Sequence, residues 1–172
     1  ISYNCHFLAY RAGSWYLPDS AIVSSINAAR NAGALAISMS FSGPSPSNSI
    51  KNALTNAYNA GVVNVAAAGN SGGTAKEYPA AHSNVIGVAS CNQSGGRSGF
   101  STWGQWVSVA APGENILSCW KNKQYAYADG TSMACPHVAG LAALHMQAHP
   151  GASASEILNP ARLDSQAGHG VL

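Results

Sequence analysis

A serine stands at the expected start of a helix in residues 129–140, which read DGTSMACPHVAG. A proline is tolerated near a helix start, because the first four backbone N–H groups have no intrahelical partner there. This predicts that the helix begins at Thr131 or Ser132, with Pro136 in its fourth or fifth position. The Ser132 hydroxyl then lies in the positive field of the helix terminus, and its N–H points outward. Ser132 is therefore either a helix N-cap or a nucleophile beside half of an oxyanion hole.

A second polar group follows an apolar strand in residues 65–70, which read VAAAGN. In open α/β sheets, ligands bind outside the C-terminal ends of the strands. Asn70 can aim an amide donor at negative charge that develops there, or it can be an ordinary turn residue after Gly69.

Together these segments resemble the serine and oxyanion-asparagine motifs of the subtilisin-like serine proteases, the subtilases, with the thermitase and proteinase K-like branch the most similar. Further blocks fit in the same order: SFSGP at 40–44, EYPA at 77–80, SGFSTWG at 98–104 and VAAPG at 109–113. The resemblance covers essentially the whole chain.

The resemblance implies acyl transfer in a serine endopeptidase. Ser132 Oγ would attack a peptide carbonyl, while the Ser132 N–H and the Asn70 side chain would bind the tetrahedral oxyanion. Other residues would hold the peptide substrate, in part as an added strand. The implied substrate-binding residues are Ser40, Phe41, Ser42, Ala67, Ala68, Gly69 and Thr131, of which Ala67, Ala68 and Gly69 would line one wall of the pocket for the residue before the cut.

Two positions depart from the family pattern. Ser42 stands where the family usually has Gly, and its side chain would narrow the pocket or the binding strand. Asn92 stands where proteinase K-like members have a calcium-binding Asp, which weakens any metal assignment, and no metal ligands are assigned. The resemblance leaves room for a structural calcium ion on backbone carbonyls near Ala80 and His82, and the chemistry requires no cofactor.

The partners of Ser132 are missing from their expected places. A subtilisin triad runs Asp, His, Ser along the chain, yet no D-T/S-G or H-G-T-H block precedes Ser132, and Asp19 looks like a helix cap. The histidines are interpreted as structural or surface residues: His6, His82, His137, His145 and His149.

Asp164 and His169 follow Ser132 in the order of an α/β-hydrolase, but the G-x-S-x-G elbow of that fold is absent. We therefore interpret residues 1–172 as one partial peptidase domain, trimmed at both ends, inactive and poorly soluble alone. The alternative is a non-catalytic subtilase-like domain that binds peptides.

The elements around these residues predict an α/β fold, a three-layer doubly wound mostly parallel sheet that is incomplete at its N-terminus. Helices are expected from Asp19 or Ser20 to Gly33 and at about 47–60, 131–148 and 153–158, the last with a Ser153/Glu156 capping box. Strands are expected at 6–10, buried, at 34–39, buried on both faces, and at 62–66, 85–89, 106–110, 116–119 and 124–128.

Composition indicates a globular domain, and the family resemblance implies that it acts on peptides or proteins. Apolar residues make up 47% of the 172 residues, charged residues only 8%, and the net charge is +2. Without a Lys/Arg cluster we expect no nucleic acid partner, and without a long apolar run we expect no membrane span. The family resemblance implies a secreted enzyme that is monomeric when complete. The four cysteines match no zinc or redox spacing and are expected to be mostly small buried hydrophobic residues. If the protein is secreted, the sequence also allows one disulfide, whose pairing it does not specify.

Overall fold

A computed structural model describes residues 5–152, 154–158 and 170–171 of the chain. Its central feature is a parallel sheet in the order β1-β2-β3-β4-β7. The strands are β1 (Ala36–Met39), β2 (Val63–Ala67), β3 (Ile86–Cys91), β4 (Val109–Pro112) and β7 (Gly170–Val171). Because β1 and β2 are parallel neighbours, their C-terminal ends lie side by side, with Met39 opposite Ala66.

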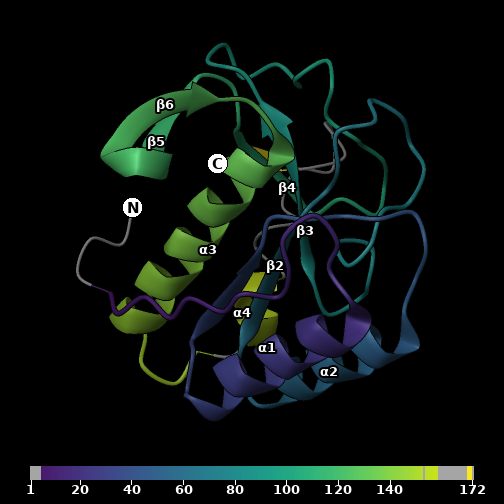
Figure 1. Ribbon diagram of the computed structural model, residues 1–172. Coiled ribbons are helices and arrows are strands. Elements are labelled where there is room, and N and C mark those ends of the chain that lie inside the picture. Colours follow the sequence, from purple (N-terminus) through teal and green to yellow (C-terminus); the bar gives the residue numbers. More distant parts are fainter. Residues whose placement is uncertain (1–4, 153, 159–169, 172) are drawn as a thin grey trace.

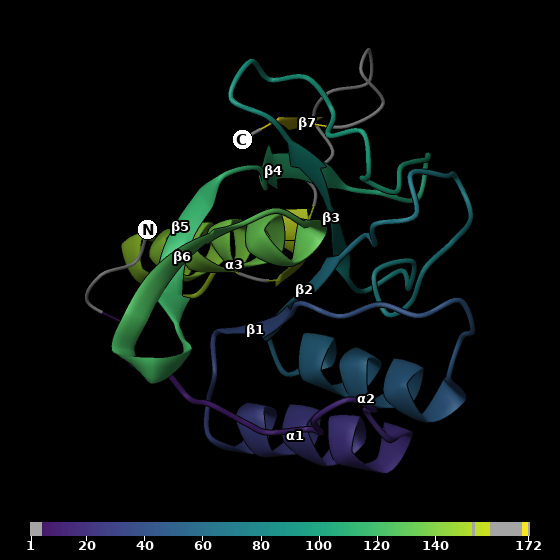
Figure 2. The same cartoon turned by 45° about the horizontal axis from the view of Figure 1, so that its top comes forward.

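Helices cover both faces of this sheet, which confirms the predicted three-layer α/β architecture (Figures 1 and 2). On one face lie α1 (Asp19–Asn31) and α2 (Asn48–Asn59), which pack on each other and bury Ile22, Ile26 and Leu54. On the other lie α3 (Thr131–Ala148) and α4 (Ala154–Leu158).

The middle of the sheet carries the core that α3 covers. All residues of β2 and β3 are buried, as expected for parallel strands covered on both faces. Val65, Val88 and Ala134 of α3 belong to one apolar cluster. The start of α3 is therefore held against the ends of the strands, which is where the candidate site lies.

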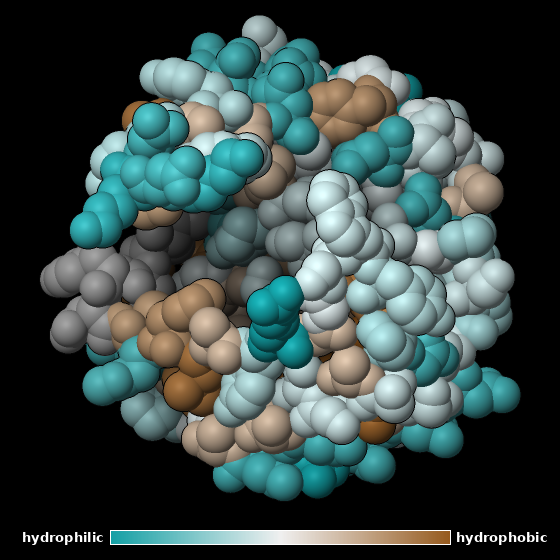
Figure 3. Space-filling model, viewed as in Figure 1, coloured by the Kyte–Doolittle hydropathy of each residue, from teal (hydrophilic) through white to brown (hydrophobic). Residues whose placement is uncertain are grey.

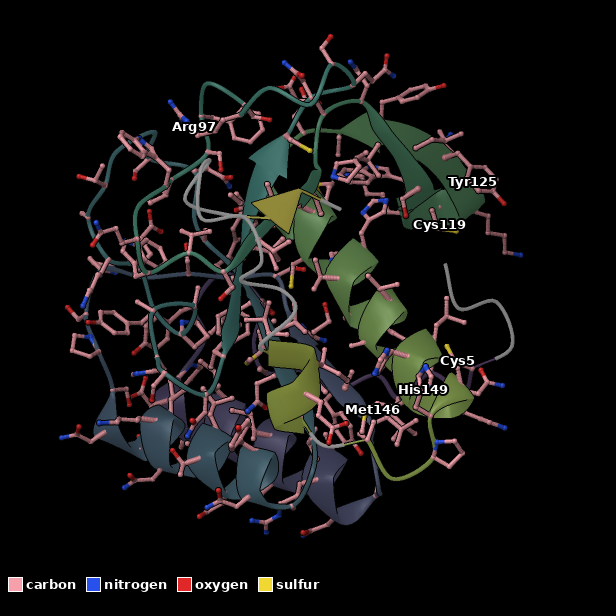
Figure 4. The ribbon with its side chains drawn as sticks, turned by 180° about the vertical axis from the view of Figure 1, so that it is seen from behind. Cys5, Arg97, Cys119, Tyr125, Met146 and His149 are labelled. Atoms are coloured by element: carbon pink, nitrogen blue, oxygen red, sulfur yellow. The ribbon has the colours of Figure 1, made fainter. Side chains whose placement is uncertain are left out.

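A separate antiparallel hairpin stands beside α3 (Figure 2). It consists of β5 (Ile116–Trp120) and β6 (Gln124–Ala128), joined by the short 3-10 turn η1 (Lys121–Lys123). Tyr125 and Cys119 are exposed on this hairpin, where Figure 4 labels them.

The predicted buried strand at 6–10 is wrong. These residues are exposed, with Phe7 at 86%, and form no strand. Their segment crosses the C-terminal end of α3 in Figure 1, and Figure 4 shows Cys5 near His149 at this end. Figure 3 shows apolar side chains gathered at the lower left of the face seen in Figure 1. An apolar run specifies a strand only when a neighbouring strand supplies hydrogen bonds, and among the described residues none does.

Other boundaries also need correction. Strand β1 is an edge strand with only Met39 buried, because among the described residues it pairs with β2 alone. The strand expected at 106–110 is β4, which begins at Val109. Pro18 occupies the N-cap of α1, with no side-chain cap, so Asp19 is a first-turn residue. Helix α2 has the cap its sequence favours, since Ser47 Oγ accepts from Ile50 N at 3.3 Å.

The cysteines divide evenly between two environments. Cys91 and Cys135 are buried, as expected, while Cys5 and Cys119 are exposed, and the described residues contain no disulfide. Burial raises the pKa of the Cys135 thiol, although hydrogen bonds from Ser38 and the backbone oppose this shift. The Ser153/Glu156 capping box lies partly outside the described residues.

Candidate active site

Ser132 lies in the first turn of α3 and contacts the chain just after β1. Its Oγ donates to the Ser40 carbonyl at 3.1 Å, and Ser40 Oγ donates back to the Ser132 carbonyl at 2.9 Å. The helix begins at Thr131, so Pro136 is its sixth residue, beyond the predicted fourth or fifth position. Pro136 has no N–H to offer the Ser132 carbonyl, which leaves that oxygen available to Ser40.

Asn70 is oriented by Thr131. Asn70 Oδ1 accepts hydrogen bonds from Thr131 N at 2.9 Å and from Thr131 Oγ1 at 3.0 Å. Because both contacts are donors, they require the amide oxygen on that side and turn Nδ2 the other way. Thr131 is fully buried, and its hydroxyl also accepts from Gly69 N at 3.1 Å. Thr131 thus ties the loop after β2 to the start of α3.

The Asn70 amide and the Ser132 N–H converge beside Gly130. A Cβ placed on Gly130 would lie 3.6 Å from Ser132 N and 3.7 Å from Asn70 Nδ2. Neither donor has an acceptor within the described part of the chain. Gly130, at φ +152°, has no side chain to fill this space. Two convergent unsatisfied donors next to a serine hydroxyl are the arrangement that stabilises an oxyanion.

The family model of the subtilases, described as "Subtilase family", matches residues 1–164. The chain belongs to the subtilase family. It is 47% identical to thermitase from Thermoactinomyces vulgaris over 146 residues, which cover 85% of this chain and 50% of thermitase. It is 44% identical to subtilisin DY from Bacillus licheniformis over 152 residues, covering 86% of this chain and 55% of that protein.

Solved structures agree with the sequence relatives. A cold-adapted subtilisin-like serine proteinase superposes with a TM-score of 0.80 at 34% identity, covering 85% of this chain and 54% of the other. An S41 psychrophilic protease gives a TM-score of 0.79 at 32% identity, covering 90% and 58%. The subtilase chain thus spans about half the length of the relatives that it matches.

No histidine of the described residues contacts the Ser132 hydroxyl. The ring of His137 lies on α3 with Nδ1 against the Met133 carbonyl at 2.8 Å. The rings of His145 and His149 contact each other, with centroids 4.6 Å apart. His6 is exposed. Asp164 and His169 lie outside the described residues, so the α/β-hydrolase order is not tested.

His82 lies in a different environment. Its Nε2 is buried without a hydrogen-bond partner in the described residues, and its ring packs 4.9 Å from that of Tyr78. Burial, and secondarily the positive charge of Lys51, lower the pKa of His82 below its ordinary value of 6.5. The imidazole is therefore favoured in its neutral form, as a packing group.

The Glu77 carboxylate lies between the two predicted substrate-binding segments, 40–42 and 67–69. Segment 40–42 is joined to Glu77, because Ser42 Oγ donates to Glu77 Oε2 at 2.5 Å. Ala67 and Ala68 are buried, and Gly69 lies against the Glu77 carboxylate. In the sequence, Glu77 stands out only as part of the EYPA block. The signal that could have found it is an acidic residue beside the predicted pocket in a chain with few charges.

The described residues offer no cluster of metal-binding side chains. They contain no group of three or more His, Cys, Asp and Glu side chains placed to hold an ion. Asn92 Oδ1 is occupied by the N–H groups of Ser94 and Gly96, both at 3.0 Å. The His82 carbonyl accepts from Val85 N at 3.2 Å. Calcium near Ala80 and His82 stays a prediction, and nothing below depends on it. Over the described residues, no helix is long and apolar enough to cross a membrane.

Proposed function

We propose that Ser132 is the nucleophile of a serine endopeptidase and that Asn70 Nδ2 and the Ser132 N–H bind the oxyanion. The observation that carries this proposal is the convergence of the two donors on the space beside Gly130. Membership of the subtilase family supports the same chemistry. The free edge of segment 40–42 would hold the peptide as an added strand.

The reaction needs a general base that the described residues do not supply. The Ser132 hydroxyl donates its hydrogen bond to the Ser40 carbonyl and not to a base. A serine hydroxyl is a weak nucleophile without a base. We propose that a complete enzyme adds an acidic residue and a histidine to this site. The 172-residue chain alone is then expected to show no turnover of a chromogenic peptide above background.

The test compares two proteins made from the gene that encodes this chain. The polypeptide from the full open reading frame should cleave peptide p-nitroanilides and react with a fluorophosphonate probe. Its Ser132→Ala variant should lose about six orders of magnitude in kcat, a loss for which subtilisin is the reference case. Cleavage that survives Ser132→Ala would exclude Ser132 as the nucleophile.

The alternative is a peptide-binding domain that retains the serine without a base. The Ser132–Ser40 hydrogen bonds favour it, because they satisfy the hydroxyl in a resting arrangement. This alternative predicts peptide binding without cleavage and no fluorophosphonate labelling. An open reading frame that contains no D-T/S-G and H-G-T-H blocks before Ile1 would also favour it.

The remaining features of the enzyme follow from the family. We propose a secreted protein that acts on peptides or proteins as a monomer and needs no cofactor for catalysis. The subtilase relatives support the protein substrates and the secretion. Dialysis against EDTA should therefore leave kcat unchanged, and a fall in thermal stability on the same treatment would indicate structural calcium.

A further inference from the structure

The carboxylate of Glu77 lies between the two segments that the proposed function assigns to substrate binding. On one side Ser42 Oγ donates to Oε2 at 2.5 Å. On the other side the carboxylate occupies the position that a Cβ on Gly69 would take. Gly69 has φ +102° and directly precedes Asn70. The Glu77 carboxylate therefore contacts the residue that directly precedes Asn70, the proposed oxyanion donor.

Neutral hydroxyl groups fix the orientation of this carboxylate. Besides Ser42, Ser71 Oγ donates to Oε1 at 3.0 Å and Thr102 Oγ1 donates to Oε1 at 2.8 Å. Thr102 is fully buried, and its N–H holds the Gly69 carbonyl at 2.9 Å. Three hydroxyl donors from three separate segments hold the group in one place, so its position is built into the fold.

These hydrogen bonds leave the negative charge uncompensated. No Lys, Arg or His nitrogen forms an ion pair with Glu77 within the described residues. Glu77 is half-buried. A neutral side chain placed over it would remove water from the charge without providing a partner, which is unfavourable. A cation placed there would gain a charge-assisted hydrogen bond instead.

We propose that Glu77 selects substrates with Lys or Arg immediately before the cleaved bond. This rests on the proposed function, because it deepens the substrate class of the same site. The aliphatic stem of a Lys or Arg would pass between segment 40–42 and the chain after β2, and its charged head would reach the carboxylate. Ser42, which replaces the usual glycine, then has a role, because it orients Glu77 from the opposite segment.

The test uses the full open reading frame product and two matched peptide p-nitroanilides, which carry Lys or Leu before the bond. The wild type should cleave the Lys peptide at least 10-fold more efficiently in kcat/KM. Glu77→Gln keeps the size and hydrogen bonding but removes the charge. It should lower kcat/KM for the Lys peptide by about 10- to 100-fold and leave the Leu peptide unchanged or faster. Glu114→Gln, the same change at a half-buried site elsewhere, should alter neither.

Binding separates this inference from the proposed function. In the Ser132→Ala background, fluorescence anisotropy should show tighter binding of a dye-labelled Lys peptide than of its Leu counterpart, and Glu77→Gln should abolish the difference. If the enzyme cleaves peptides but prefers Leu, or if Glu77→Gln has no effect, the specificity inference is overturned and the protease stands. If cleavage is absent but the binding difference is present, the protease proposal fails and the role of Glu77 stands. Absence of both overturns both.

Discussion

Ser40 and Ser132 exchange two hydrogen bonds, one in each direction. The Ser132 hydroxyl donates to the Ser40 carbonyl at 3.1 Å, and the Ser40 hydroxyl donates to the Ser132 carbonyl at 2.9 Å. The second bond exists because Pro136, four residues beyond Ser132, cannot supply the usual helical donor. The proline in the serine motif thus couples the nucleophile to the segment that we propose binds the substrate.

This coupling predicts a non-additive pair of substitutions. Ser40→Ala should lower the free energy of unfolding by about 1 kcal/mol, because the Ser132 carbonyl loses its protein donor. Pro136→Ala restores an N–H that can bond the Ser132 carbonyl. In that background, Ser40→Ala should cost close to nothing. Urea unfolding of the four proteins in this double-mutant cycle measures the difference, and equal costs in both backgrounds would contradict the coupling.

Substitutions at Asn70 distinguish the role of its Oδ1, which accepts from Thr131, from that of its Nδ2, the proposed oxyanion donor. Asn70→Asp keeps an oxygen for Thr131 N but loses the Nδ2 donor and adds negative charge near the oxyanion. We expect kcat to fall by at least 10²–10³, the range for which subtilisin is the reference case, with stability close to wild type. Asn70→Ala should lose a similar factor in kcat and about 1 kcal/mol of stability, since Thr131 N also loses its acceptor. Steady-state kinetics with matched unfolding curves check both, and an active Asn70→Asp would exclude the donor role.

Gly113 controls the position of Gly130. Its carbonyl accepts from Gly130 N at 2.8 Å, and an added Cβ would meet Ser90 Oγ and lie 2.7 Å from the Gly130 carbonyl. Gly113→Ala should therefore cost about 1–3 kcal/mol of stability and reduce kcat, because Gly130 leads into Ser132. Gly99→Ala is the matched control, with nothing within 4 Å of the added atom. Thermal unfolding should shift for the first variant and barely for the second.

His82 predicts a dependence of stability on pH. Because burial and Lys51 lower its pKa below 6.5 in the folded protein, the unfolded chain takes up the proton first as the pH falls. The free energy of unfolding should therefore decrease as the pH drops below about 6.5 towards the folded pKa, and should show no contribution from His82 above that range.

Two variants isolate this effect. His82→Gln should remove the His82 part of the pH dependence, so the stability gap to wild type should differ between pH 8 and pH 5. Lys51→Met should weaken the dependence, because the repulsive charge is gone. A stability gap that stays constant across this pH range would show that His82 does not titrate differently in the two states.

The sequence alone determined the family and the layer architecture, and it singled out Ser132 and Asn70 as the candidates for the proposed site. The start of α3 at Thr131 and its end at Ala148 follow from local chemistry, as do α2 with its Ser47 cap and the buried strand β2. Helix periodicity, capping and buried apolar runs act over a few residues, so they are visible in the order of the chain.

The tertiary structure decided what depends on contacts between distant segments. The exposure of residues 6–10 and the edge position of β1 are set by which strands are neighbours, and no local pattern records that. The contact of Glu77 with both Ser42 and Gly69 joins residues 35 and eight positions apart in the chain. Such pairs come together only when the loops after β1 and β2 meet at one edge of the sheet, because parallel strands bring their C-terminal ends side by side.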